Sequence, residues 1–199
     1  KYERKITPEP EQTEAHRLEI TADVPVDAFY KCWHMASRLD KRYYIADLLS
    51  DILGGSASSR LHQSLVKEKK LFVGIECYHL GSTDTGLMTI AGKLVKGVSP
   101  EEAEKAVEEE LEKMRLDGAA AAELQKVKNK TESLMAFEDM SIMSRANSLA
   151  YYELLGNAAW INEELDKYAA VTTEDIREES RRIYRPENSN TIYYKAALS

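Results

Sequence analysis

The chain has 199 residues, of which 43% are apolar and 31% are charged, and these are the shares of an ordinary globular protein. They exclude a disordered chain, a collagen-like fibre and a disulfide scaffold, and no apolar run approaches the roughly 18–20 residues of a membrane span. The net charge of −7 argues against nucleic acid as a partner, because an acidic chain repels phosphate backbones.

Residues 1–13 carry Pro8 and Pro10 among charged residues and show no apolar period. Proline disfavours a helix interior or a central strand, so this stretch predicts an extended interdomain linker. Residues 14–199 are predicted to form a single domain. The chain starts without an initiator Met and shows no signal-peptide pattern, so we expect it to be a segment of a longer protein.

The first half of the chain combines strand and helix patterns. Apolar segments rich in β-branched and aromatic residues predict strands at 16–22, 26–36, 71–80 and 86–95, the last two joined as an antiparallel hairpin. Apolar residues at helical spacing predict a helix over 41–53, with Asp40 as N-cap and Gly54 and Gly55 at its end. A short helix over 59–68, capped by Ser58, is predicted to follow.

From Ser99 onward the apolar period changes from 2 to 3.6. Ser99, Pro100 and Glu102 form a capping-box pattern for a helix that ends at Asp117-Gly118. A helix or a broken pair is predicted over 120–155, with an apolar stripe of Leu124, Val127, Leu134, Met135, Met143, Leu149 and Leu154. Two more helices at 158–169 and 173–184, the second capped by Thr172 or Thr173, precede a last strand at 190–196. The order β-β-α-α-β-β-α-α-α-α-β predicts an α+β fold, an antiparallel sheet with helices packed on one face.

Cys32 and Cys77 are the only cysteines, and both fall in predicted strands. Two thiols 45 positions apart make no metal-binding motif, so we expect buried free thiols. Reduced thiols make the cytoplasm the default compartment, although nothing in the sequence identifies the compartment itself.

The four histidines, His16, His34, His62 and His79, form neither His-x-x-Glu-His nor a helical i, i+4 pair. We therefore expect structural or surface roles for them and no zinc site in this chain. The glycine- and serine-rich stretch LGGSASSRL (53–61) lacks the Gly-Lys-Ser/Thr ending of a phosphate loop and follows a helix, which favours a helix end.

The acidic run EEAEKAVEEELEK (101–113) places Glu104 and Glu108, or Glu108 and Glu112, on one helix face. Acid–base chemistry needs a desolvated carboxylate, whereas this face is expected to be in contact with water. The residues by themselves assign no catalytic or metal-binding side chain, and they leave substrate-binding residues unknown.

The stretch LGGSASSRLHQSLVKEKKLFV (53–73) resembles the central motif of the second domain in insulinase/pitrilysin-type zinc peptidases, which include the mitochondrial processing peptidases. That motif reads approximately L-G-G-G-x-S-S-R-L-x-Q-x-L-R-E-x-x-G-L-x-Y. The positions that match it without a gap are Leu53, Gly54, Gly55, Ser58, Ser59, Arg60, Leu61, Gln63, Leu65 and Leu71. The stretches 8–20, 144–157 and 170–194 are also similar to this family, so the resemblance covers nearly the whole chain.

The resemblance implies a C-terminal, non-catalytic domain that closes a peptide-binding chamber against a catalytic half. Zinc is expected in that other half, bound through a His-x-x-Glu-His motif that this chain lacks. The implied partners are the catalytic half, in the same polypeptide or a partner subunit, and a peptide substrate. A homodimer of the parent is a further expectation.

This chain differs from the family motif in two respects, and these differences leave more than one function open for the parent protein. The motif has an Arg and a Tyr that hold substrate near the zinc, and this chain has Val66 and Val73 at those positions, with Lys70 where Gly is usual. The parent is then expected either to hold its substrate differently or to be a catalytically inactive structural or assembly subunit. A stand-alone peptide-binding module is a third interpretation.

Overall fold

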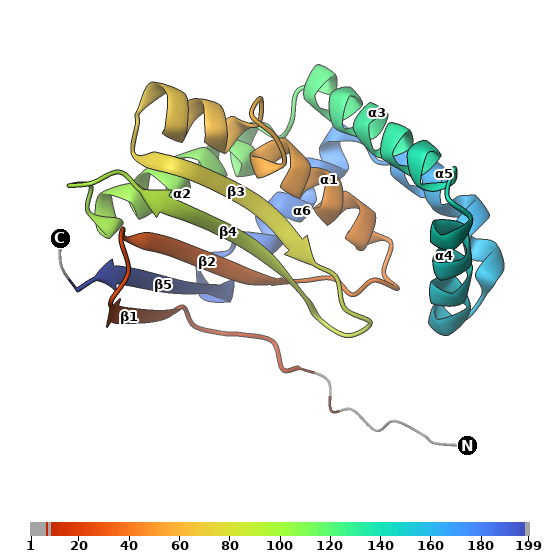
Figure 1. The fold of residues 1–199 in the computed structure, drawn as a ribbon, viewed down its shortest axis with the longest axis horizontal. Coiled ribbons are helices and arrows are strands. Elements are labelled where there is room, and N and C mark those ends of the chain that lie inside the picture. The colour runs from red at the N-terminus through yellow and green to blue at the C-terminus, as the bar shows by residue number, and fades with distance from the viewer. Residues whose placement is uncertain (1–6, 8, 198–199) are drawn as a thin grey trace.

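The computed structural model describes residue 7 and residues 9–197. Figure 1 shows one sheet with helices gathered against it and a helical region extending to one side. The strands are β1 (His16–Ala22), β2 (Ala28–Met35), β3 (Phe72–Leu80), β4 (Gly86–Leu94) and β5 (Ser189–Ala196). The helices are α1 (Arg42–Gly54), α2 (Pro100–Asp117), α3 (Ala121–Glu138), α4 (Ile142–Leu155), α5 (Glu164–Ala169) and α6 (Thr173–Ile183). Shorter or non-α helices are η1 (His62–Glu68), η2 (Ala158–Glu163) and η3 (Pro186–Asn188).

The five strands form one sheet in the order β1-β5-β2-β4-β3, which confirms the predicted α+β class. Three neighbouring pairs are antiparallel, as expected, but β1 and β5 run parallel. No hairpin constrains this last pair, because the whole helical part of the chain lies between the two strands. A long crossover is the connection that parallel pairing requires.

The helix caps follow the predicted chemistry. The Ser99 hydroxyl accepts a hydrogen bond from the Glu102 backbone N–H at 3.1 Å, with Pro100 as the first residue of α2. Thr172 caps α6. The predicted N-cap of α1 is wrong by one residue, because Lys41 occupies that position, but the Asp40 carboxylate still accepts from the Arg42 N–H at 2.9 Å. Each contact satisfies a backbone donor that the first helical turn leaves free.

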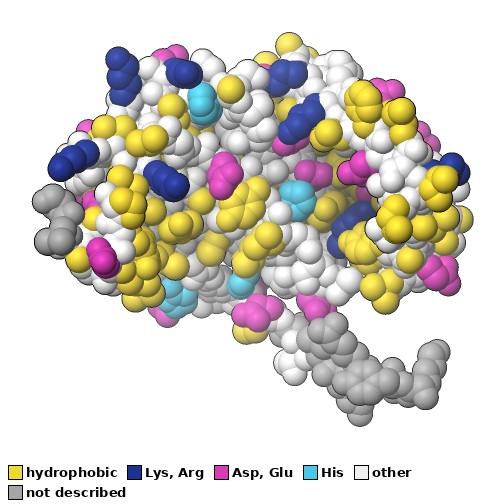
Figure 2. Space-filling model, in the orientation of Figure 1, with side chains coloured by type: hydrophobic (Ala, Val, Ile, Leu, Met, Phe, Trp, Pro, Cys, Tyr) yellow, Lys and Arg dark blue, Asp and Glu magenta, His cyan; other side chains and the backbone are white. Residues whose placement is uncertain are grey.

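The predicted helical stretch 120–155 is a broken pair, α3 and α4, but its apolar stripe is only partly buried. Leu124 and Val127 lie in the core, whereas four residues that were expected to be buried are exposed: Leu134, Met143, Leu149 and Leu154. Figure 2 shows hydrophobic side chains at the surface on the right of the view, where Figure 1 places α4. Met135 still packs against the core, so the interpretation of this stripe as part of the domain's own core is wrong at Leu134 and for the stripe residues of α4.

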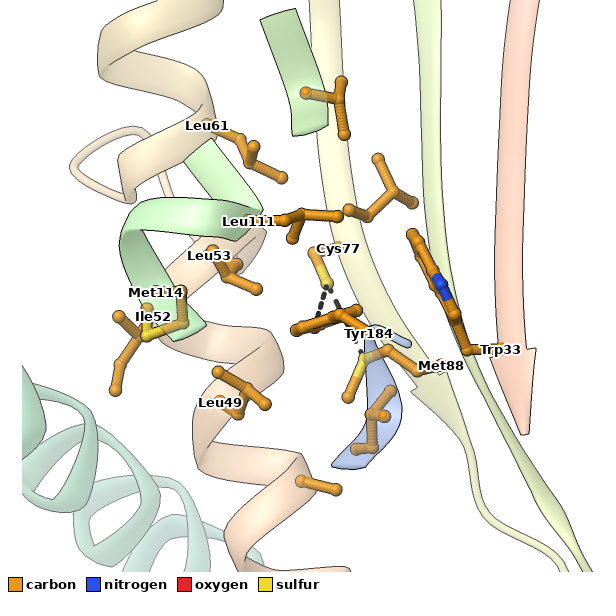
Figure 3. Packing of buried hydrophobic residues seen from close by; sticks show 14 of the residues in the cluster. Trp33, Leu49, Ile52, Leu53, Leu61, Cys77, Met88, Leu111, Met114 and Tyr184 are labelled. Carbon is orange, nitrogen blue, oxygen red and sulfur yellow. Dashed lines mark hydrogen bonds between the residues drawn. The ribbon is translucent and has the colours of Figure 1, made fainter. Parts of the chain in front are cut away.

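The core lies between the inner face of the sheet and helices α1, α2 and α6. Figure 3 shows Tyr184 between Cys77, Met88 and Trp33, and its ring meets that of Trp33 edge-on with centroids 4.9 Å apart. Burial raises the pKa of the Cys77 thiol to about 12, so the thiol stays protonated. The prediction of a buried thiol is confirmed for Cys77, while Cys32 is only half-buried.

The expectation that the acidic face of α2 is in contact with water is wrong for Glu104. Its carboxylate lies against the sheet, where it accepts hydrogen bonds from Lys31 at 2.7 Å, from Arg17 at 2.5 Å and from the Tyr193 hydroxyl. Burial by itself would raise the pKa of Glu104, but the hydrogen bonds from Lys31 and Tyr193 outweigh it and the pKa is lowered. Glu104 is thus an ionised structural residue that joins α2 to the sheet.

None of the helices in the described part of the chain is long and apolar enough to cross a membrane.

Candidate functional site

Three backbone irregularities fall within residues 62–74. The helix η1 has π-type hydrogen bonding, Lys70 has a φ of 54°, and the pairing of β3 with β4 shifts register between Phe72 and Gly74. Lys70 is the only non-glycine residue with positive φ in the described part of the chain. π-Helices, left-handed residues and β-bulges all concentrate at functional sites, so this segment is the candidate site.

The π-helix replaces the ordinary short helix expected over 59–68. The Lys69 N–H donates to the Ser64 carbonyl, five residues back, at 2.8 Å, and Leu71 N–H reaches the Leu65 carbonyl at 2.9 Å. Ser58 does not cap this helix, because its hydroxyl contacts Ser56 and Lys126 instead. A short helix is nevertheless present in this region, and its Leu65 side chain is fully enclosed.

Gly54 and Arg60 hold the start of the site in place. A Cβ atom on Gly54 would lie 2.0 Å from the Cys77 backbone nitrogen, so only glycine lets the end of α1 contact β3. The Arg60 guanidinium donates to both carboxylate oxygens of Glu123, at 2.8 and 2.7 Å, and to the Gly118 carbonyl at 2.9 Å. These motif residues therefore build the scaffold of the segment, which supports a structural role over a phosphate loop.

Lys70 occupies the position where the family motif has glycine, and it adopts the conformation that glycine favours. A left-handed conformation costs an L-residue about 1–2 kcal/mol. The positive φ at this position supports the ungapped alignment of residues 53–73 with the motif.

Val66 and Val73 lie where that alignment places them, near the end of η1 and at the start of β3. Their surroundings differ, since Val66 packs against the edge of the core and Val73 is 65% exposed. Neither can donate a side-chain hydrogen bond. The charged residues between them are Lys67, Glu68, Lys69 and Lys70, all exposed, and Lys69 pairs with Glu109 at 2.7 Å.

The histidines do not form a metal centre. Within the described residues, no group of three or more His, Cys, Asp and Glu side chains could hold a metal ion. The His79 imidazole contacts the Tyr43 hydroxyl at 2.9 Å and the Asp47 carboxylate at 3.5 Å. Burial raises the pKa of Asp47, which also accepts a hydrogen bond from Tyr168 at 2.5 Å. This network links β3, α1 and α5.

A second buried polar cluster was not foreseen from the sequence. The Arg38 guanidinium pairs with Glu164 at 2.5 Å and donates to the hydroxyls of Tyr44 at 2.9 Å and Tyr152 at 3.1 Å. Burial and the Glu164 carboxylate raise the pKa of Tyr152. The cluster ties α4 and α5 to the loop before α1, and its members are too far apart in the sequence to show a local pattern.

The sheet, its helical cover and the segment from Gly54 to Val73 define an α+β domain that carries a peptidase-like motif. The chain belongs to the peptidase M16 inactive domain family, whose model matches residues 1–131. This agrees with the resemblance inferred from the motif.

One relative in sequence and two solved structures are consistent with membership of this family. The chain is 27% identical over 146 residues to the uncharacterized zinc protease YmxG of Bacillus subtilis strain 168, a match covering 72% of this chain and 35% of the relative. Its fold is similar to that of a protease from Helicobacter pylori, with a TM-score of 0.89 at 20% identity over 94% of this chain and 46% of the other. An inactive peptidase domain from Bordetella parapertussis matches with a TM-score of 0.76 at 17% identity, over 87% of this chain and 96% of that one. The chain thus spans less than half of the first two proteins.

Proposed function

We propose that this chain is the non-catalytic half of a zinc-dependent peptidase and closes a peptide-binding chamber against a catalytic half. Membership of an inactive peptidase domain family supports this role, as does the greater length of the relatives named as proteases. In this proposal residues 1–13 link the two halves and residues 14–199 form the domain. Zinc bound in the catalytic half would polarise the peptide carbonyl and activate water.

One observation carries the proposal. A π-helix, a left-handed lysine and a register shift lie together between His62 and Gly74, in the segment where the family resemblance places a substrate-holding pair. Gly54 and Arg60 fix this segment to β3 and to the turn before α3, so it is a rigid surface. Its role in this proposal is to position the peptide, while the chemistry takes place in the other half.

The valines at positions 66 and 73 predict a slow enzyme on generic peptides. Loss of one hydrogen-bond donor to a developing oxyanion commonly costs about 2.7–4 kcal/mol of transition-state stabilisation. Val73 is exposed, so a Tyr there would have room to reach a peptide. Val66 packs against the core, so an Arg there would have to extend its guanidinium past the edge of η1.

The test is to restore the pair in the zinc-loaded parent protein. Val66→Arg with Val73→Tyr should raise kcat more than either change alone, because both groups would act on one bound peptide. Leu18→Tyr, at an exposed position of β1 on the edge of the sheet opposite to β3, is the control and should leave kcat unchanged. Unchanged turnover in a folded, zinc-loaded double variant would contradict the proposed role of this surface.

The absence of the Arg/Tyr pair favours a second candidate, a catalytically inactive structural or assembly subunit of the same fold. A peptidase assay on the parent, with zinc added and then removed by a chelator, separates the two. Activity that disappears with the chelator supports the peptidase, and no activity at any zinc concentration supports the structural subunit.

A further inference from the structure

A pocket of about 340 Å³ lies beside the Arg38 cluster, between the loop that precedes α1 and the helices α4, η2 and α5. Figure 1 places α4 and α5 at one end of the molecule, and no residue of the segment 62–74 lines the pocket. The volume is within the range of sites that bind small molecules, about 300–1,000 Å³. The pocket is therefore a second candidate site, separate from the one described above.

Aromatic and aliphatic side chains form most of the pocket wall. They come from the loop before α1, the first turn of α1, one face of α4 and the helix η2, and they are Leu39, Tyr44, Tyr152, Leu155 and Trp160. Tyr44 and Tyr152 are buried, whereas Leu39 is 56% exposed. A wall of this kind is suited to an apolar ligand body.

The end of α4 fixes the indole of Trp160. Gly156 has a φ of 139°, a conformation that other residues rarely adopt, and a Cβ atom there would lie 3.1 Å from the Trp160 ring. The Asn157 side chain then accepts a hydrogen bond from the Ala159 N–H at 2.9 Å and begins η2. These local contacts hold the indole against the helix end, so the pocket wall is preorganised for a ligand.

The charged residues that line the pocket are all cationic: Arg38, Lys41 and Lys167. No described Asp or Glu lines it, although the chain has a net charge of −7. Glu164 compensates the charge of Arg38 at 2.5 Å. Within the described residues Lys41 forms no salt bridge, and Lys167 has only Glu163, at 3.5 Å and with a side chain that is 60% exposed. Two lysines thus remain to neutralise an anion in the pocket.

The Lys167 ammonium is held where it can meet such an anion. Its Nζ lies 5.7 Å from the centroid of the Tyr44 ring and 5.9 Å from that of Trp160, distances at which a cation is attracted to an aromatic face. A ligand whose apolar part packs on these rings therefore places an acidic group next to the ammonium. The hydroxyls of Tyr44 and Tyr152 accept hydrogen bonds from Arg38, so the ligand need not satisfy them.

We propose that this pocket binds a small carboxylate with an aromatic or branched aliphatic body. The body packs between Leu155 and Trp160, and the carboxylate accepts hydrogen bonds from the ammonium groups of Lys41 and Lys167. A phosphate suits the pocket less, because guanidinium forks and backbone N–H groups are its usual partners and the one guanidinium here is paired with Glu164. The inference goes beyond the proposed function and does not rest on peptidase activity.

Titration of the 199-residue chain with phenylpropionate tests the proposal. Trp160 lines the pocket and Trp33, the other tryptophan, is buried in the core, so tryptophan fluorescence should report saturable binding in the millimolar range or tighter. The neutral phenylpropionamide should bind at least about 10-fold more weakly, because it forms neither ion pair. Phenylpropylamine should not bind, since both lysines repel it.

Substitution of the two lysines tests their role. Lys167→Met and Lys41→Met should each weaken phenylpropionate binding at least about 5-fold, since each removes one charge and keeps an unbranched side chain. Lys105→Met, at an exposed lysine of α2 outside the pocket, makes the same charge change and is the matched control, with unchanged affinity. Far-UV circular dichroism checks the folding of each variant, and the comparison of carboxylate with amide needs no substitution.

The same chemistry is present in a free acid and in the C-terminal residue of a peptide, and the tripeptide acetyl-Gly-Gly-Phe separates these sources. Binding as tight as that of phenylpropionate assigns the pocket to a peptide C-terminus, and binding at least about 10-fold weaker assigns it to a free acid. The proposal is overturned if phenylpropionate shows no saturable binding, if the amide or the amine binds equally well, or if both lysine variants bind like the control.

Discussion

Helices α1 and α4 are of nearly equal length, 13 and 14 residues, and both carry leucines at helical spacing. In α1 the leucines Leu48, Leu49 and Leu53 are completely enclosed, whereas in α4 Leu149 and Leu154 are 48% and 79% exposed. Hydrophobic periodicity identifies one face of a helix, but the neighbouring elements decide whether that face lies in the core of the same chain.

The difference has a physical origin in the position of the two helices. Helix α1 lies on the inner face of the sheet and contacts β3, α3 and α6, so its apolar stripe meets other apolar surfaces. Helix α4 follows a turn at 139–141 and lies beyond the sheet, where its main neighbour is η2. Its attachment is a polar cluster around Arg38, which needs no apolar stripe.

The largest expected effect tests this contrast directly. Leu49→Ala should lower the free energy of unfolding by about 3–4 kcal/mol, because it leaves a cavity in a fully packed region. The same substitution at Leu154 should change it by no more than about 0.5 kcal/mol in the monomer. Urea unfolding of both variants measures the two values. Similar losses at the two sites would mean that the α4 leucine is buried in the monomer.

The buried charge of Glu104 gives the next effect. Glu104→Gln should cost about 1.5–3 kcal/mol at pH 7, because the buried Lys31 loses one of its two carboxylate partners and keeps only Glu108, also at 2.7 Å. The folded pKa of Glu104 lies below its unfolded value of about 4.3, so its contribution is present above that pH and is lost as the pH falls through the folded pKa.

Unfolding by urea at a series of pH values checks the sign of this effect. The stability difference between the unsubstituted chain and the Gln variant should be constant near neutrality and shrink below about pH 4.3. A difference that grows on acidification would show that Glu104 is protonated in the native state.

The smallest effect is expected at Lys70. Lys70→Gly should raise the free energy of unfolding by about 0.5–1 kcal/mol, since relief of the left-handed conformation exceeds the entropy that glycine adds to the unfolded chain. Lys69→Gly is the matched control, because Lys69 has an ordinary φ of −77° and the same change there should destabilise. Thermal unfolding compares the two, and a loss at both positions would rule out strain at Lys70.

Most of the fold follows from local patterns in the sequence. The caps at Ser99 and Thr172 and the glycine ending of α1 mark helix boundaries, because each involves groups a few residues apart. The parallel partner of β1, the burial of Glu104 and the exposure of Leu154 depend on contacts between distant segments. No local period contains that information.

The candidate site, too, could be predicted only as far as local sequence patterns determine it. Its location follows from the Gly54–Arg60 motif, and the lysine at a glycine position was the one local sign of an unusual backbone. The π-helical hydrogen bonding of η1 and the bulge at Gly74 depend on how β3 is held by α1 and β4. Likewise, the link from Arg38 to Glu164 spans 126 positions and has no counterpart in the sequence pattern.

The parallel pairing of β1 with β5 has a consequence for how the chain acquires its structure. His16 pairs with Asn190, and the register continues to Ala22 beside Ala196, so this contact joins the two ends of the described sequence. Contacts of such high sequence separation slow folding, because nearly the whole chain must be ordered before they form. During synthesis β2, β4 and β3 can assemble on α1 early, whereas β1 has no pairing partner until β5 has been synthesised. Until then β1 is an unpaired strand, the kind of segment that chaperones protect from aggregation.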